Sequence, residues 1–281
     1  SIKEEYRNIE ILRSDKNLGL GEGLNQAIKK VKTKYVLISN FDVTYDKNAV
    51  KEFIKAINKL DDNYIGLAPK IKFSYQKDYL ESVGLYLDGN LYIGYNGIGQ
   101  LDLDQYNRPE DIFGVSFTAS FLKTESFSND KIGPIDPTFF LFYEDIDFCY
   151  RANLIGCRFK SCPSAVCYHK YAYSFRDEAT SFQKKYYYLK LNLLKTTYKN
   201  AEKPNLKKIL DNEISIQKNN LKDKNLNPTA KKILKYFKKS IKYLKRKRQG
   251  IQYYRQLYDS DIIKYCWGEY NYFDIAKNEP V

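Results

Sequence analysis

The sequence has no methionine, one histidine, one tryptophan and no long apolar run. A membrane-spanning helix needs about 18 or more consecutive apolar residues, so no segment is expected to cross a bilayer, and no signal peptide is recognisable. Because methionine is absent even at position 1, we expect the sequence to be a piece of a longer translated product.

Cysteine occurs five times, an odd number, and never as a Cys-x-x-Cys pair. With a single histidine as the other candidate ligand, this pattern argues against a structural zinc site. We expect reduced and mostly buried thiols, as in a cytosolic protein. The cysteines are Cys149, Cys157, Cys162, Cys167 and Cys266.

A length of 281 residues allows one large domain, or one domain with an appendage. Hydrophobic residues make up 43% and aromatic residues 16%, which indicates a globular rather than a disordered protein. Tyrosine is abundant, with 27 residues. Such side chains suit surfaces that stack on sugars or lie at a membrane boundary.

The net charge of +13 comes from one segment of the chain. Between Lys203 and Arg248 there are 16 basic and three acidic residues, whereas the rest of the chain has 31 of each sign. Within this segment an apolar stripe from Ala230 to Leu244 predicts an amphipathic helix surrounded by lysines.

Three interpretations of this basic helix are considered. Its stripe could pack on the rest of the protein and leave a solvated basic face, or residues 230–248 could contact a membrane surface from one side. Nucleic-acid binding ranks last, because no recognition helix or aromatic-plus-basic motif is present. We therefore expect no nucleic-acid partner, and the first two interpretations stay open.

Apolar strands and amphipathic helices alternate in the first part of the chain, which predicts an α/β fold. Glycines among tyrosines and leucines over residues 79–111 predict hairpins or an active-site flap. The pattern becomes helical further on, so we expect a domain over residues 1–180 and a helical, basic extension over residues 181–281. Strands are expected at Asn8–Leu12, Tyr35–Ser39, Tyr64–Ala68 (closed by Pro69), Val115–Leu122, Arg158–Lys160 and Ala165–Tyr168, and an early helix over Lys47–Leu60.

Two polar motifs follow short strands near the start. Gly19, Gly21 and Gly23 are expected to form a tight loop that leads into a helix with Leu24 on its apolar face. Such a loop can cradle phosphate through backbone N–H groups, although a simple tight turn explains it equally well. Further on, the strand ending at Ser39 runs into Asn40-Phe41-Asp42, at the kind of edge where open α/β sheets bind ligands.

The most acidic motif follows an apolar and aromatic run. Glu144, Asp145 and Asp147 lie at the predicted start of a helix, and Asp147 and Arg151 are spaced to form an ion pair one turn apart. Asp145 has no evident local partner, so it could act as a general base. The alternative is that acidic residues simply favour helix N-termini because of the dipole.

In this order the motifs resemble those of family 2 glycosyltransferases with the GT-A fold, in the rhamnosyltransferase-like branch. The resemblance covers roughly residues 8–175. It implies a Rossmann-like mixed sheet flanked by helices, with the first strand–helix unit of the family lacking before Ser1. Four segments carry it: residues 17–25, 39–43, 133–151 and 163–169.

The resemblance also implies roles for individual residues. Asp42 is expected to bind Mg²⁺ or Mn²⁺ on the donor diphosphate, with His169 completing the metal site, although a hydrogen-bonded core histidine is the alternative for His169. Asp145 matches the base that deprotonates the acceptor, and Glu144 beside it is expected to be catalytic as well. Asn40 stands where the family has Asp or Asn, so metal binding is expected to rest mainly on Asp42. The donor-binding residues would be Asn17, Gly19, Gly21, Asn25, Asn40 and Asp42, supported by Asp147 and Arg151.

The function implied is that of an inverting, metal-dependent glycosyltransferase in cell-surface polysaccharide or glycoconjugate synthesis. It would move a hexosyl or rhamnosyl group from a UDP- or dTDP-sugar to a saccharide or lipid-linked acceptor, at the inner face of the cell membrane. The alternative is a non-catalytic protein that binds nucleotide-sugars or carbohydrates on the same scaffold, because the segment that would hold the base of the nucleotide is not recognisable.

Overall fold

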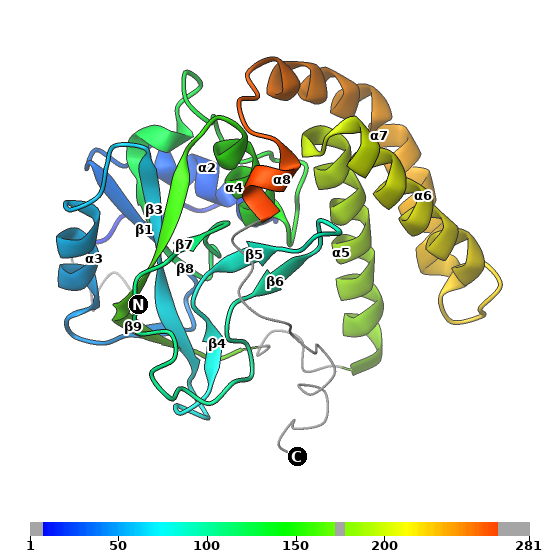
Figure 1. Ribbon diagram of the computed structural model, residues 1–281. Helices are drawn as coiled ribbons and strands as arrows, with labels where there is room; N and C mark the ends of the chain where they lie inside the picture. Colours follow the sequence, from blue (N-terminus) through cyan, green and yellow to red (C-terminus); the bar gives the residue numbers. More distant parts are fainter. Residues whose placement is uncertain (1–7, 172–177, 264–281) are drawn as a thin grey trace.

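Figure 1 shows the computed structural model, which describes residues 8–171 and 178–263. A mixed β-sheet flanked by helices occupies one side, and long helices pack together on the other. The expected fold class, a mixed α/β sheet followed by a helical extension, is confirmed. In the described ranges no helix combines the length and apolar character needed to cross a bilayer.

The central sheet has the strand order β1-β8-β3-β9-β2. Only the β3–β9 pair of this path is parallel, and the other neighbours are antiparallel. Two short strands add to the sheet, β4 beside β3 and β7 beside β9, while β5 and β6 form a separate hairpin. The bounds are β1 Tyr35–Ser39, β2 Val43–Tyr45, β3 Tyr64–Phe73, β4 Leu80–Ser82, β5 Leu85–Leu87, β6 Ile93–Tyr95, β7 Asp111–Ile112, β8 Ala119–Lys123 and β9 Arg158–His169.

Helices pack on both faces of this sheet. On one face, Phe53 of α3 (Ala49–Ile57) stacks on Phe121 of β8, with ring centroids 5.1 Å apart. On the other face, α4 (Glu144–Leu154) joins a larger core that contains Leu122, the next residue of β8. Neighbouring residues of a strand point to opposite faces, so β8 is buried on both sides. The remaining short elements are α2 (Leu20–Ile28) and the 3₁₀ helix Thr124–Phe127.

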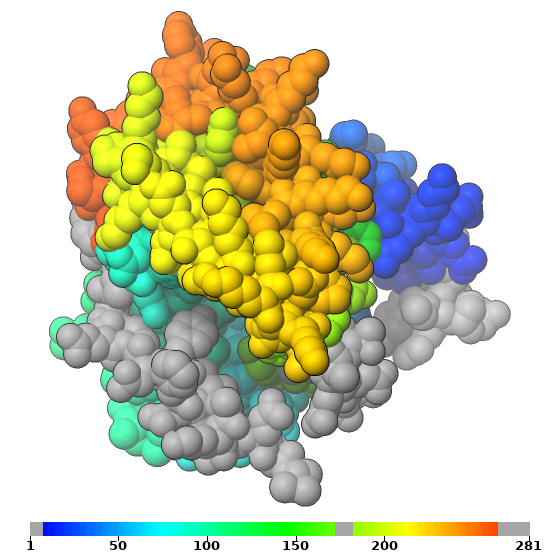
Figure 2. Space-filling view, turned by 90° about the vertical axis from the view of Figure 1, so that its right-hand side faces the viewer, coloured from blue at the N-terminus to red at the C-terminus, as the bar shows by residue number. Residues whose placement is uncertain are grey.

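The helical extension consists of α5 (Glu178–Asn200), α6 (Lys203–Asn220), α7 (Asn227–Tyr253) and the short α8 (Asp259–Ile263). The apolar stripe of α7 is buried against α5, where Phe237 and Leu244 pack with Leu194. Its lysines remain exposed on the outer surface, on the side of the molecule that Figure 2 shows, where α6 and α7 appear in yellow to orange. For the stripe, the packing interpretation is therefore the one that the structure shows.

Some strand predictions are wrong in their bounds. Pro69 does not close β3 but lies within it, and the two strands predicted in residues 158–168 form the single strand β9. Lys70 pairs with Val166 although Pro69 pairs with Cys162, so β9 bulges at this point. A bulge accommodates proline, because it leaves backbone positions outside the hydrogen-bond ladder.

The strand predicted over Asn8–Leu12 is absent, and these residues have no regular structure. Ile9 and Leu12 are exposed, and no described strand pairs with this segment. An alternating sequence pattern becomes a strand only where a neighbouring strand satisfies its backbone groups.

Candidate functional site

The turn between β1 and β2 carries the Asn40-Phe41-Asp42 motif. The backbone N–H of Asn40 donates to the carbonyl of Thr118 at 2.9 Å, which anchors the turn to the segment before β8. Beyond the turn, β2 pairs with the end of β9, with Val43 opposite His169. The backbone of Lys170 then donates to the carbonyl of Asp42 at 3.1 Å. This strand pairing brings Asp42 and His169 together, although they lie far apart in the sequence.

His169 lies between two carboxylates. Its Nδ1 is 2.8 Å from Oε2 of Glu81, from β4, and its Nε2 is 3.3 Å from Oδ1 of Asp42. Burial alone would lower the pKa of His169, but the hydrogen bond and charge of Glu81, with the charge of Asp42, raise it. Burial also raises the pKa of Glu81, against the effect of His169.

Asp42 and His169 fit a divalent cation. Oδ1 of Asp42 is buried, and apart from Nε2 of His169 at 3.3 Å it has no hydrogen-bond partner in the described part of the chain, so it can accept a metal ion. His169 has one ring nitrogen held by Glu81, an arrangement that commonly orients a metal-binding histidine. The described residues contain no group of three His, Cys, Asp or Glu side chains placed around one metal position. A site of two protein ligands suits Mg²⁺ or Mn²⁺, which take further oxygen ligands from substrate phosphates and water.

The carboxylate helix α4 begins at Glu144, as predicted. Asp145 is 8% exposed, and its oxygens accept from the backbone N–H groups of Phe117 at 3.2 Å and Ile146 at 2.8 Å. Burial raises the pKa of Asp145, and these two N–H groups act against the rise. Because Thr118, the residue after Phe117, holds the Asn40 turn, one short segment connects Asp145 with the Asp42 motif.

Glu144, the neighbour of Asp145, is only 4% exposed. Burial and the charge of Asp145 raise the pKa of Glu144 to about 8. Its Oε2 makes no hydrogen bond within the described residues. Of the two carboxyl groups, Asp145 is the better hydrogen-bonded one, so its charged form is better stabilised than that of Glu144.

The backbone just before α4 is strained. Phe142 and Tyr143 both have positive φ angles, 64° and 72°, which side-chain-bearing residues seldom adopt. The side-chain amide of Asn192, on α5, donates to the carbonyls of Leu141 and Phe142 at 2.8 and 2.9 Å. Asn192 of the helical extension thus stabilises the turn that positions Glu144 and Asp145.

A buried ion-pair network stabilises the position of α4. The predicted pair forms, with Arg151 Nε 3.1 Å from Asp147 Oδ2. Lys199, 1% exposed, adds a second cation, 2.8 Å from Asp147 Oδ1 and 2.5 Å from Asp136 Oδ2. Burial alone would raise the pKa of Asp136, but Lys199 and the hydrogen bonds from Thr138 hold it well below its usual range.

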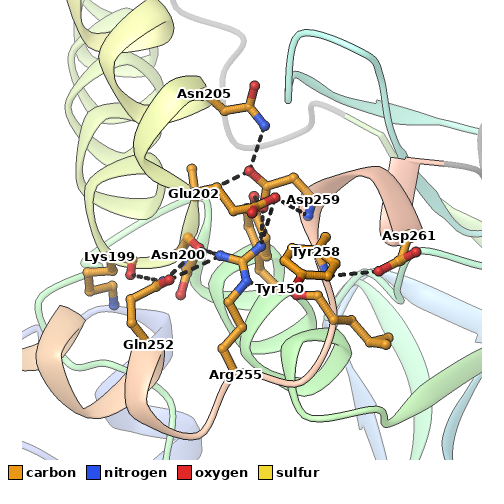
Figure 3. Close-up of polar contacts among 12 residues, drawn as sticks. Tyr150, Lys199, Asn200, Glu202, Asn205, Gln252, Arg255, Tyr258, Asp259 and Asp261 are labelled. Carbon is orange, nitrogen blue, oxygen red and sulfur yellow. Dashed lines mark hydrogen bonds and ion pairs between the residues drawn. The ribbon is translucent and has the colours of Figure 1, made fainter.

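A second polar cluster holds α4 to the end of the helical extension (Figure 3). The hydroxyl of Tyr150, on α4, donates to Asp259 at 2.9 Å, and Arg255 pairs with the same carboxylate at 2.6 Å. Asp259 also accepts from the backbone of Glu202 and from the amide of Asn205, so this fully buried carboxylate is well satisfied. Helix α4 is therefore anchored at several positions by residues beyond 180.

The glycine-rich motif is more helical than expected. Helix α2 begins at Leu20, so Gly21 and Gly23 lie inside it, and only Gly19 belongs to the preceding loop. Gly19 has a φ of 77°, and a Cβ there would lie 2.4 Å from the carbonyl oxygen of Phe140. Asn17 Oδ1 accepts from the Gly19 N–H at 3.0 Å, which closes a turn before the helix. The loop ends earlier than predicted because this turn and the close contact already start the helix.

Helix α2 lies against the loop that leads to α4. A Cβ at Gly21 would lie 3.0 Å from Ile135. Asn25 is buried, and its amide exchanges two hydrogen bonds with the backbone of Ile135, at 2.8 and 3.0 Å. These contacts hold the motif in place, and the donor-binding roles of Asn17, Gly19, Gly21, Asn25 and Asn40 stay predictions.

Sequence reasoning missed three residues that shape this region: Glu81, Asp136 and Lys199. Glu81 is a lone acid in a short apolar strand, and Lys199 is one lysine among many on a helix. The one usable signal was Asp136, which stands in the segment that carries the family resemblance. Their roles depend on contacts between distant parts of the chain, Glu81 to His169 across 88 residues and Asp136 to Lys199 across 63.

Comparison with known proteins adds a partial family match. Residues 1–129 match the family model described as "Glycosyl transferase family 2". The match contains the Asn17–Asn25 and Asn40–Asp42 motifs and ends before Asp145 and His169. No curated protein matches the chain.

Among solved structures, one described as "Crystal structure of GalNAc-T7 with UDP, GalNAc and Mn2+" resembles this chain with a TM-score of 0.48 and 13% sequence identity. The alignment covers 75% of this chain and 45% of that one, so the chain spans less than half the length of that neighbour. UDP, GalNAc and Mn²⁺ are ligands of that protein.

Proposed function

We propose that this protein is an inverting, metal-dependent glycosyltransferase of the rhamnosyltransferase-like branch of family 2. It transfers a hexosyl or rhamnosyl group from a UDP- or dTDP-sugar to a saccharide or lipid-linked acceptor in cell-surface polysaccharide or glycoconjugate synthesis. The observation that carries this proposal is the match of residues 1–129 to the glycosyl transferase family 2 model. The geometry around Asp145 and Asp42 supports specific roles within it.

Asp145 is the general base in this proposal. Inverting transfer requires a carboxylate that takes the proton from the acceptor hydroxyl as its oxygen attacks the anomeric carbon. The backbone N–H groups of Phe117 and Ile146 orient the Asp145 carboxylate, and the buried setting raises its pKa, which makes it a stronger base. Glu144 beside it has a pKa raised to about 8 and is therefore mainly neutral at pH 7.

Asp42 and His169 hold the divalent cation in this proposal. When bound, the cation neutralises negative charge on the diphosphate leaving group. Glu81 orients His169 through Nδ1, so the other nitrogen faces Asp42. Asn40, in the turn that presents Asp42, would contact the donor from the same side.

The alternative is a non-catalytic protein that binds nucleotide-sugars or carbohydrates on the same fold. The two functions differ in turnover, because only the enzyme releases nucleoside diphosphate when donor, acceptor and Mg²⁺ or Mn²⁺ are supplied. Detection of nucleoside diphosphate release by coupled assay over a panel of UDP- and dTDP-sugars is the direct test. Tight donor binding without any release would support the alternative.

Metal binding provides a more specific prediction. We expect Asp42→Ala and His169→Ala each to weaken Mn²⁺ affinity by more than about tenfold, because each removes a ligand, and Glu81→Gln by about 10–100-fold through loss of orientation. Mn²⁺ titration followed by electron paramagnetic resonance measures this without turnover. The exposed Asp61 provides the matched control, and Asp61→Ala should leave the titration unchanged. An unchanged titration in His169→Ala would make the histidine structural.

We also propose peripheral contact with an anionic membrane surface through residues 230–248, at the inner face of the cell membrane. Because the apolar stripe of α7 is buried, this contact rests on the exposed lysines alone, each of which contributes roughly 1 kcal/mol near an anionic surface.

Measurements of vesicle binding and of thermal unfolding distinguish the role of the exposed lysines of α7 from that of its buried apolar stripe. Replacing Lys231, Lys235, Lys238, Lys242 and Lys245 with glutamine should release the protein from anionic vesicles at low salt without lowering its melting temperature. Phe237→Ala should instead cost about 3 kcal/mol of stability, because the ring is 6% exposed within the α5–α7 core, and should not change vesicle binding. If wild-type protein did not bind anionic vesicles at low salt, the membrane contact would be excluded.

A further inference from the structure

A cleft of about 460 Å³ lies between α5 and α7. Its size is in the range of small-molecule sites, which is about 300–1,000 Å³. Leu191, Asn192 and Lys195 contribute from α5, Lys239 and Ser240 from α7, and Thr138 from the loop before α4. None of its lining residues belongs to the Asp42–Glu81–His169 group or to the carboxylates of α4, so the cleft is distinct from the candidate active site.

The charge in this cleft is positive and only partly compensated. Lys195 and Lys239 line it, and none of the described residues that line it is acidic. Lys195 is 8% exposed, and its Nζ donates to the carbonyl of Thr138 at 2.9 Å, which occupies one of its three N–H groups. Within the described residues no carboxylate lies at ion-pair distance from it, and burial lowers its pKa to about 8. A buried ammonium group without a carboxylate partner is costly, and an anionic ligand would offset that cost.

The nearby acidic residue Asp136 does not fill this role. Its oxygens are already engaged by Lys199, Thr138 and the hydroxyl of Tyr243, which donates to Oδ1 at 2.9 Å. Lys195 therefore lines the cleft without a carboxylate partner among the described residues, and its Nζ lies 5.4 Å from the centroid of the Phe139 ring.

Tyrosine rings form the remaining walls. Tyr187 and Tyr188 come from α5, and Tyr236 and Tyr243 from α7. The rings of Tyr187 and Tyr236 meet edge to face with centroids 6.3 Å apart, and Lys239 Nζ lies 5.7 Å from the Tyr236 centroid. Aromatic faces pack on the C–H faces of a sugar ring, and their hydroxyls suit its polar rim. The two lysines provide compact cationic groups of the kind that bind phosphate.

We propose that the α5–α7 cleft binds a phosphorylated sugar, with the phosphate held by Lys195 and Lys239 and the sugar ring packed on the tyrosines. This inference goes beyond the proposed function, because it requires neither donor, metal nor turnover. Asn192 lines the cleft and also holds the Leu141 and Phe142 carbonyls, so a ligand here contacts a residue that supports the turn before Asp145.

Calorimetric titration of the intact protein with glucose 1-phosphate, without nucleotide or metal, tests the proposal. A ligand of this size is expected to bind with a Kd of about 1 mM or below. Glucose and inorganic phosphate alone should each bind at least tenfold more weakly, because each makes half of the contacts. Dodecyl phosphate is the lipid-like arm of the test, and it should also bind more weakly than glucose 1-phosphate.

Substitutions in and near the cleft test whether glucose 1-phosphate binds there. Lys195→Met should weaken glucose 1-phosphate binding at least tenfold and preserve the fold, because a buried ammonium is replaced by an apolar side chain of similar length. Tyr236→Ala, at a half-exposed position, should weaken it to a smaller degree, and Lys235→Met on the outer face of the same helix should not change it. Absence of binding to wild-type protein, equal binding to Lys195→Met, or tighter binding of dodecyl phosphate would overturn the proposal.

Discussion

Replacing Asp145 with asparagine is expected to lower the rate of sugar transfer by about 10²–10⁴-fold, the usual effect of losing a general base. Asparagine keeps the shape of the side chain, and its one carbonyl oxygen can accept from one of the two N–H groups, of Phe117 and Ile146, that the carboxylate oxygens of Asp145 bind, so the fold and donor binding should be retained. Single-turnover assays with saturating donor, together with a donor titration, measure the two properties separately.

Glu144→Gln is the matched control for this prediction. With a pKa of about 8, Glu144 is mainly protonated at neutral pH, and glutamine imitates that neutral form. We therefore expect Glu144→Gln to keep most of the activity at pH 7. If Glu144→Gln lost as much activity as Asp145→Asn, or if Asp145→Asn turned over normally, the assignment of the base to Asp145 would be wrong.

The second large effect is expected on stability. Lys199→Met should lower the free energy of unfolding by about 3–5 kcal/mol, because it leaves the buried carboxylates of Asp136 and Asp147 without the cation that lies between them. Urea unfolding at pH 7 measures this loss. Lys207→Met is the control, because Lys207 forms an exposed ion pair with Asp211, and its unfolding midpoint should not change.

The pH dependence of this loss identifies its cause. In the wild-type protein the pKa of Asp136 is lowered, so the stabilisation is present above the pKa of the unfolded carboxyl, near 4, and is lost as the pH falls through the folded value. In Lys199→Met burial would raise the pKa of Asp136, so the carboxyl can protonate and the penalty should shrink as the pH falls towards 4. A loss of stability that is constant from pH 7 to pH 4 would point to packing rather than charge.

Local features of the site could be predicted from the sequence. The start of α4 at Glu144 follows from the change from apolar to acidic residues, and the Asp147–Arg151 pair follows from helical spacing. Asp42 and His169 were placed by the order of family motifs, and their proximity results from the β2–β9 pairing. The sequence contains no local signal for that pairing, because most of the other strands lie between β2 and β9 along the chain.

Other features depend on where a residue lies in three dimensions. Proline usually ends a strand, yet Pro69 continues β3 because the neighbouring strand bulges beside it. Glycines at alternate positions predicted a loop, yet Gly21 lies inside α2, where its lack of a side chain lets the helix pack closely against Ile135. In each case the local preference is weak compared with the packing that overrides it.

The contacts of α5 have a consequence for engineering the protein. Asn192 holds the turn before α4, Lys195 bonds to Thr138, and Lys199 joins Asp136 to Asp147, so three side chains along one helix support the carboxylate helix. The sheet and the helical extension are therefore not interchangeable modules. A chimaera that took residues 133–151 from one homologue and α5 from another would combine the carboxylate helix with a mismatched scaffold, so the two segments must be exchanged together.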